Sequence, residues 1–164
     1  MKIFLCVIIV FFSGLIGLHV KDKFRKEVVF YNEIHMFLQY ISIKIAFFQD
    51  VYADCIEAFT NSSALKNQRF FNQLLKLVKS GKLTQENFNS IVEIELSKQE
   101  QEELFQIFSK IGSTDITGQE KLLAGYSEQI KIKKEEIEKY KKTNADIFAK
   151  LSICIGIVIC ILIY

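Results

Sequence analysis

The sequence contains no proline and no tryptophan, and only seven of its 164 residues are glycine. Proline and glycine interrupt helices more often than any other residues, so their scarcity permits long uninterrupted helices. The chain also lacks any long stretch in which apolar and polar residues alternate, the pattern of a half-buried strand. Together these absences predict an all-α fold.

The four cysteines do not form a disulfide or metal-binding pattern. Cys6, Cys154 and Cys160 lie in apolar runs near the two ends of the chain, and Cys55 stands alone between them. A glycine-rich phosphate loop, a zinc-binding His-Glu motif and a nucleophile elbow are also missing from the sequence. We therefore predict no catalytic residues, no metal site and no cofactor, and expect a protein that is not an enzyme.

The sequence also lacks a large excess of either positive or negative charge. The formal net charge is +2, and Lys2 and Lys150 account for it, so the segment between Lys21 and Ala149 has equal numbers of basic and acidic residues. A nucleic-acid-binding protein gains most of its affinity by neutralising phosphates, and a balanced segment does not favour that function.

Each end of the chain carries a long apolar run beside basic residues. These runs predict one transmembrane helix over residues 1–20 and another over residues 147–164. Basic residues tend to remain on the cytoplasmic side of a membrane, so the middle of the chain is expected in the cytoplasm. A cleaved signal peptide, which would give an exported surface protein, is the alternative for the first run. The basic collar consists of Lys21, Lys23, Arg25 and Lys26 beside the first run and Lys141, Lys142 and Lys150 beside the second.

Residues 21–146 are predicted to form a bundle, giving about six helices in the whole protein, of which the first and last are long. The first helix starts near Phe24. Short helices are expected over residues 51–59, from about Phe70 to Ser80, from Thr84 to about Leu96, and from Ser97 to Gly112, with Asp50, Thr84 and Ser97 as caps. Ser97 to Glu100 is predicted to form a capping box, and a second one, Thr117 to Glu120, is expected to open the last helix.

The first and last helices both carry apolar residues at alternating steps of three and four, which predicts that they pair as an antiparallel coiled-coil stalk. Lys133 and Asn144 interrupt the apolar series of the last helix. Either polar residue is suited to fixing register, whether the series pairs within one chain or between the copies of a homo-oligomer. The series of the last helix contains Leu123, Tyr126, Ile130, Lys133, Ile137, Tyr140, Asn144, Ile147 and Leu151.

The short helices in the middle carry an excess of acidic residues. The only basic residues in this segment are Lys82 and Lys98. The excess of acidic residues indicates a docking face for a basic partner, and the alternative is an ordinary solvated helix surface. The interface candidates are Glu86, Glu93, Glu95, Glu102 and Glu103.

The connection before the last helix contains three residues suited to fixing a turn. Gly112 is suited to a left-handed backbone, Asp115 to binding free N–H groups, and Gln119 to reaching back to the loop. With Ile111 in place of leucine, these residues are similar to the L-G-x-x-D-x-x-x-Q signature of the stage III sporulation protein AB family of endospore-forming bacteria. The predicted anchors and long first helix also resemble that family, but its usual proline near residues 48–51 is absent.

The resemblance implies a subunit of the channel or secretion-like apparatus between mother cell and forespore, located in the mother-cell membrane around the forespore. The family's soluble domain resembles the platform protein of type II secretion and type IV pilus systems. It would accordingly dock a cytoplasmic secretion-type ATPase and other membrane subunits of the same machine. The alternative is a membrane-embedded sensor or regulator of a transport complex, whose apolar ends bind other transmembrane helices.

Overall fold

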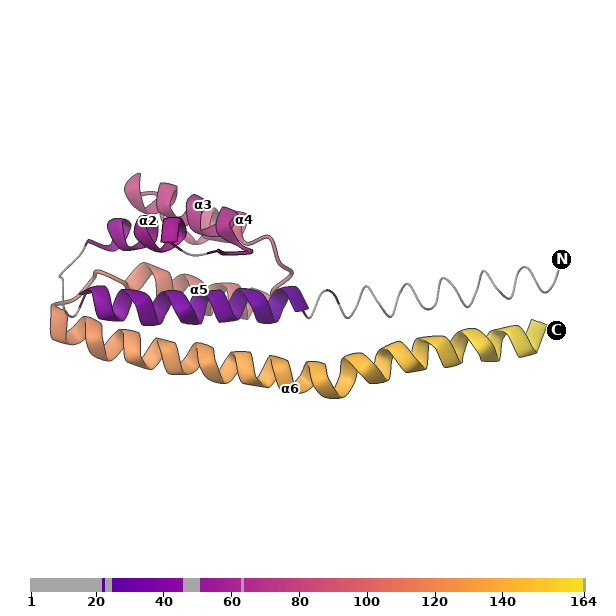
Figure 1. Ribbon diagram of the computed structural model, residues 1–164. Helices are drawn as coiled ribbons and strands as arrows, with labels where there is room; N and C mark the ends of the chain where they lie inside the picture. Colours follow the sequence, from indigo (N-terminus) through magenta and orange to yellow (C-terminus); the bar gives the residue numbers. More distant parts are fainter. Residues whose placement is uncertain (1–21, 23–24, 46–50, 63, 164) are drawn as a thin grey trace. The chain divides into compact units, whose positions relative to one another are not determined.

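The computed structural model describes residues 22, 25–45, 51–62 and 64–163. Within this part of the chain the secondary structure is helical and contains no strand, so the all-α prediction is confirmed (Figure 1). A first helix covers residues 25–45. It is followed by α2 (Tyr52–Ser62), α3 (Gln68–Lys79), α4 (Gln85–Ile91), α5 (Lys98–Lys110) and α6 (Ile116–Ile163).

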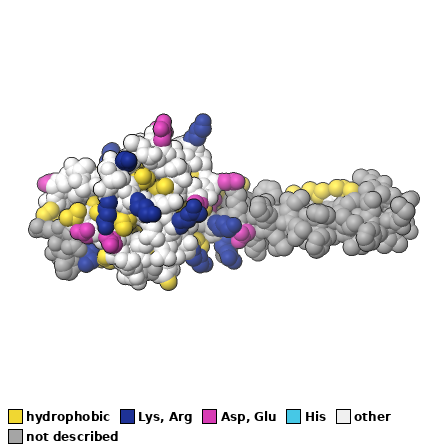
Figure 2. All heavy atoms as spheres, turned by 90° about the horizontal axis from the view of Figure 1, so that it is seen from above, with side chains coloured by type: hydrophobic (Ala, Val, Ile, Leu, Met, Phe, Trp, Pro, Cys, Tyr) yellow, Lys and Arg dark blue, Asp and Glu magenta, His cyan; other side chains and the backbone are white. Residues whose placement is uncertain are grey.

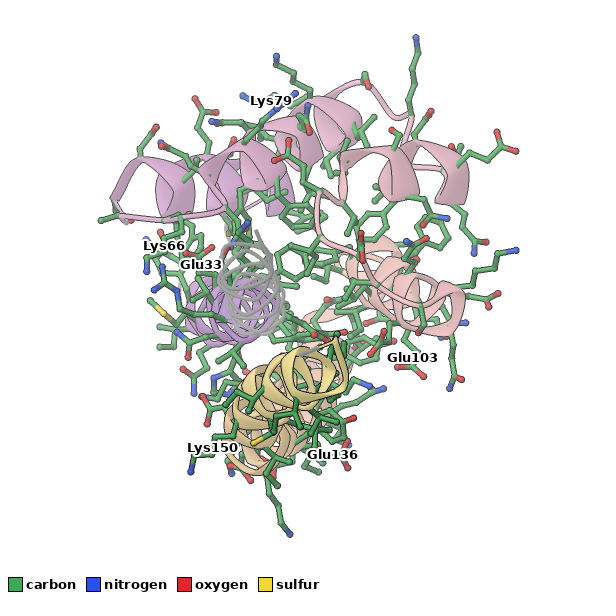
Figure 3. The ribbon with its side chains drawn as sticks, turned by 90° about the vertical axis from the view of Figure 1, so that its right-hand side faces the viewer. Glu33, Lys66, Lys79, Glu103, Glu136 and Lys150 are labelled. Atoms are coloured by element: carbon green, nitrogen blue, oxygen red, sulfur yellow. The ribbon has the colours of Figure 1, made fainter. Side chains whose placement is uncertain are left out.

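The chain divides into two compact units. The bundle unit comprises Val29–Ile132, and the terminal unit combines Met1–Val28 with Lys133–Tyr164. Within the bundle unit, α2, α3 and α4 form one layer, the first helix and α5 lie beneath it, and the start of α6 lies on the opposite side (Figures 1 and 3).

Phenylalanine side chains hold the layers of the bundle unit together. The ring of Phe37 in the first helix lies 5.2 Å from Phe59 in α2, 5.5 Å from Phe71 in α3 and 6.0 Å from Phe108 in α5, measured between ring centroids. Phe70 in α3 makes similar contacts with the first helix, α4 and α5. Phe37, Phe71 and Phe108 are completely buried. Burial of each ring contributes about 1.5–3 kcal/mol, so these contacts fix the helices in one arrangement.

Local signals in the sequence place several helix ends correctly. Thr84 accepts a hydrogen bond from the backbone N–H of Asn87 and caps α4. Ser97 and Glu100 form the expected capping box at the start of α5. Gly81, directly after the predicted end of α3 at Ser80, has a φ of +65°, in the left-handed region that favours glycine. The cap predicted at Asp50 lies outside the described residues.

Two predicted helix ends are wrong. Helix α2 continues to Ser62, and α4 stops at Ile91 instead of continuing toward Leu96. Val92, directly after α4, has an extended backbone. Ser97 is also extended, because the residue that caps the start of a helix lies outside it. Val92 and Ile94 in this connection are β-branched, which lowers their helix propensity slightly.

The apolar series of the last helix is covered over only part of its length. Leu123 and Ile130 are almost fully buried, at 0% and 3% exposure, and Ile137 is 9% exposed. Further along α6, Tyr140 and Ile147 are each more than half exposed. The alternating spacing of apolar residues therefore continues along α6 beyond the last residue whose side chain is buried.

In the described part of the chain, no helix is both long and apolar enough to cross a membrane. The segment predicted as the first transmembrane helix, residues 1–20, lies outside the described residues. The second predicted segment, residues 147–164, falls at the end of α6, where only some side chains are described. Both transmembrane segments stay predictions.

Candidate interaction surface

The acidic residues predicted as an interface lie on two capped helices and the segment between them. Glu86 is in the first turn of α4, and Glu102 and Glu103 are in α5. Glu93 and Glu95 occupy the segment that joins these helices. Glu103 is half-buried and the other four are exposed, so all five are accessible to solvent. The caps at Thr84 and Ser97 fix the backbone on which they stand.

Three of these glutamates, Glu93, Glu95 and Glu103, interact with other groups. Arg69 of α3 lies 2.9 Å from Glu93, and Gln99 donates a hydrogen bond of 2.9 Å to Glu103. The Arg69 contact was not predicted, because 24 residues separate it from Glu93 in the chain. Glu86 and Glu102 form no ion pair or hydrogen bond with another described residue, so their carboxylates are available to a partner.

A basic stripe on α3 adjoins the acidic residues. Arg69, Lys76 and Lys79 recur at steps of seven and three along the helix, which places them on one exposed side. Lys79 pairs with Glu57 of α2. Figure 2 shows lysine and arginine side chains spread over the face that α2, α3 and α4 form. The surface of the bundle therefore combines a basic region with the acidic segment, and exposed pairs such as these contribute little to stability.

The predicted turn before the last helix is present, although a different residue caps the helix. Gly112 has a φ of +82°, in the left-handed region that favours glycine. Helix α6 starts at Ile116, and the Asp115 carboxylate accepts a hydrogen bond of 3.1 Å from the backbone N–H of Gly118. The capping box predicted at Thr117 is thus wrong. Asp115 takes the capping position because it precedes the first helical residue and reaches the third.

Gln119 closes the same turn from inside. Its side chain is 2% exposed and donates hydrogen bonds to the backbone oxygen of Lys110, at 3.3 Å, and to Thr114 Oγ1, at 3.1 Å. A Cβ atom on Gly118 would lie 2.6 Å from Asp115 Oδ1 and 2.8 Å from Thr114 Oγ1, so a larger residue there would displace the cap. These contacts join the end of α5 to the start of α6 and indicate a structural role for the signature residues.

A buried carboxylate that the sequence did not reveal fixes the start of α3. Glu33, in the first helix, is 6% exposed. It accepts hydrogen bonds from the backbone N–H groups of Lys66, at 2.6 Å, and Asn67, at 3.0 Å, and from Asn67 Nδ2, at 2.7 Å. Figure 3 shows Glu33 beside Lys66. The carboxylate satisfies N–H groups at the helix start, where no intrahelical partner exists, and ties α3 to the first helix.

Tyr52 is a second polar group in the interior. Its hydroxyl oxygen is buried and has no hydrogen-bond partner among the described residues. Burial, and to a smaller extent the nearby Cys55, raises the pKa of Tyr52 above its ordinary value. The residue as a whole is half-buried with its hydroxyl oxygen inside the bundle, and the phenol remains protonated at neutral pH.

The basic collar is partly visible. Arg25 and Lys26 are exposed and lie 4.0 Å and 3.0 Å from the carboxylate of Asp22, which offsets part of their charge. Lys150 is exposed near the end of α6. Lys21 and Lys23 lie outside the described residues, and so do the side chains of Lys141 and Lys142.

A shallow groove of about 520 Å³ runs between the first helix and the start of α6. Its walls include Ser42 and Ile43 on one side and Leu123 and Ser127 on the other. Among the described residues there is no group of histidine, cysteine and acidic side chains that could hold a metal ion. The described surface thus offers regions for contact with other molecules.

A family model described as stage III sporulation protein AB (spore_III_AB) matches residues 2–164. Searches of curated proteins and of solved structures found no match to the chain. The family match covers essentially the whole length, including the turn at Gly112, Asp115 and Gln119. The chain therefore belongs to the stage III sporulation protein AB family, and its membership implies a role in sporulation.

Proposed function

We propose that this protein is a non-enzymatic platform subunit of the channel or secretion-like apparatus between mother cell and forespore. In this role the bundle unit docks a cytoplasmic secretion-type ATPase, and the two ends of the chain hold the bundle at a membrane. The family match supports a part in sporulation, and the resemblance to platform proteins of secretion and pilus systems supplies the partner class.

The acidic surface carries this proposal. Glu86 and Glu102 are exposed, have no partner among the described residues, and stand on helices whose first turns are capped. Acidic side chains on a fixed backbone attract a basic partner over several ångströms and fix the orientation in which it docks. A partner that supplies lysine or arginine side chains to this surface would satisfy both carboxylates.

The test is a double charge reversal, Glu86→Lys with Glu102→Lys, in the full-length protein. The matched control reverses two exposed glutamates of α6, Glu135 and Glu138, and so changes the net charge equally at another place. We expect the first variant to lose at least tenfold in recovery of the co-expressed ATPase and in heat-resistant spores, and the control to retain both. Unchanged recovery with a correctly folded Glu86 and Glu102 variant would rule out docking through this surface.

The proposed membrane location has separate support. Apolar side chains stand exposed around much of α6 near its end, where they would be unfavourable in water. Part of this apolar surface is visible in Figure 2. We place both ends of the chain in the mother-cell membrane around the forespore, with the bundle unit in the cytoplasm. Between 38% and 70% of each side chain is exposed at Leu151, Ile155, Ile157, Val158, Ile159 and Ile161.

Topology can be measured with a single reactive thiol. Lys82 is exposed just after α3, so Lys82→Cys in a background without the four native cysteines provides a labelling site on the bundle unit. A membrane-impermeant maleimide is applied to intact protoplasts and to lysed ones. Labelling only after lysis is expected for a cytoplasmic bundle. Labelling of intact protoplasts would place the bundle outside the cytoplasm and exclude docking to a cytoplasmic ATPase.

A further inference from the structure

We draw no further inference here: the strongest candidate, the shallow groove between the first helix and the start of α6, exposes Ile43 along one wall, but nothing in the structure shows what covers it.

Discussion

Removal of the Glu33 carboxylate is expected to loosen the start of α3 more than any other single loss of a polar group in the bundle unit. Its two oxygens accept hydrogen bonds of 2.6, 3.0 and 2.7 Å from Lys66 N, Asn67 N and Asn67 Nδ2. A hydrogen bond to a charged group contributes about 1.5–3 kcal/mol, but two of these three act on the same residue and will not add fully.

Glu33→Gln retains the shape of the side chain but directs an amide N–H₂ toward a donor. We expect this variant to lose about 2 kcal/mol of the free energy of unfolding, and Glu33→Ala, which also leaves a cavity, to lose about 3–4 kcal/mol. Since the chain has no tryptophan, unfolding in urea is followed by near-ultraviolet circular dichroism of its six tyrosines. Hydrogen exchange at the amides of Lys66 and Asn67 provides the local measurement and should accelerate.

Glu120→Gln is the matched control, because Glu120 is exposed and has no partner among the described residues. It should change the free energy of unfolding by less than about 0.5 kcal/mol. If Glu33→Gln were equally neutral and left exchange at Lys66 and Asn67 unchanged, the inference that this carboxylate fixes the start of α3 would be refuted.

Three further predictions follow from single side chains. The pKa of Tyr52 is raised in the folded protein, so the free energy of unfolding is unaffected below the unfolded-state pKa of about 10 and falls as the pH rises above it. Tyr52→Phe should reduce this loss of stability at alkaline pH in urea titrations. Tyr140→Phe, at an exposed site, should not. Gly112→Ala should cost about 1–2 kcal/mol because of its positive φ, whereas Gly125→Ala, with open space around it in α6, should stabilise by up to about 1 kcal/mol in thermal unfolding. Ser97→Ala should cost about 1 kcal/mol and increase hydrogen exchange at the Glu100 amide, since the Ser97 hydroxyl accepts the hydrogen bond of that amide, whereas the bond from the Ser97 backbone N–H to the Glu100 carboxylate can remain.

Features that depend on neighbours in the sequence were predictable. Thr84 and Ser97 accept hydrogen bonds from residues three positions later, and Gly112 is favoured by the φ angle of its own backbone. A short segment of sequence is therefore enough to predict each of these features. The cap of α6 was misplaced by two residues for a similar reason. Thr117 and Asp115 are both chemically suitable caps, and the turn closed by Gln119 decides between them.

Contacts between distant parts of the chain could not be predicted in this way. Glu33 meets a loop 33 residues later, and nothing near Glu33 distinguishes it from a glutamate on a solvated face. The same applies to the acidic surface, where the composition suggested five equivalent glutamates. The fold separates Glu93, which pairs with Arg69, from Glu86 and Glu102, which have no described partner. The carboxylates of the last two are therefore available to a partner without first breaking a described contact.

The apolar series of α6 shows most clearly what a sequence period can establish. The spacing is the same at Leu123 and Ile130, which are buried, as at Ile147 and Val158, which are more than half exposed. Periodicity therefore predicts which side of the helix requires a cover, but not which molecule supplies it.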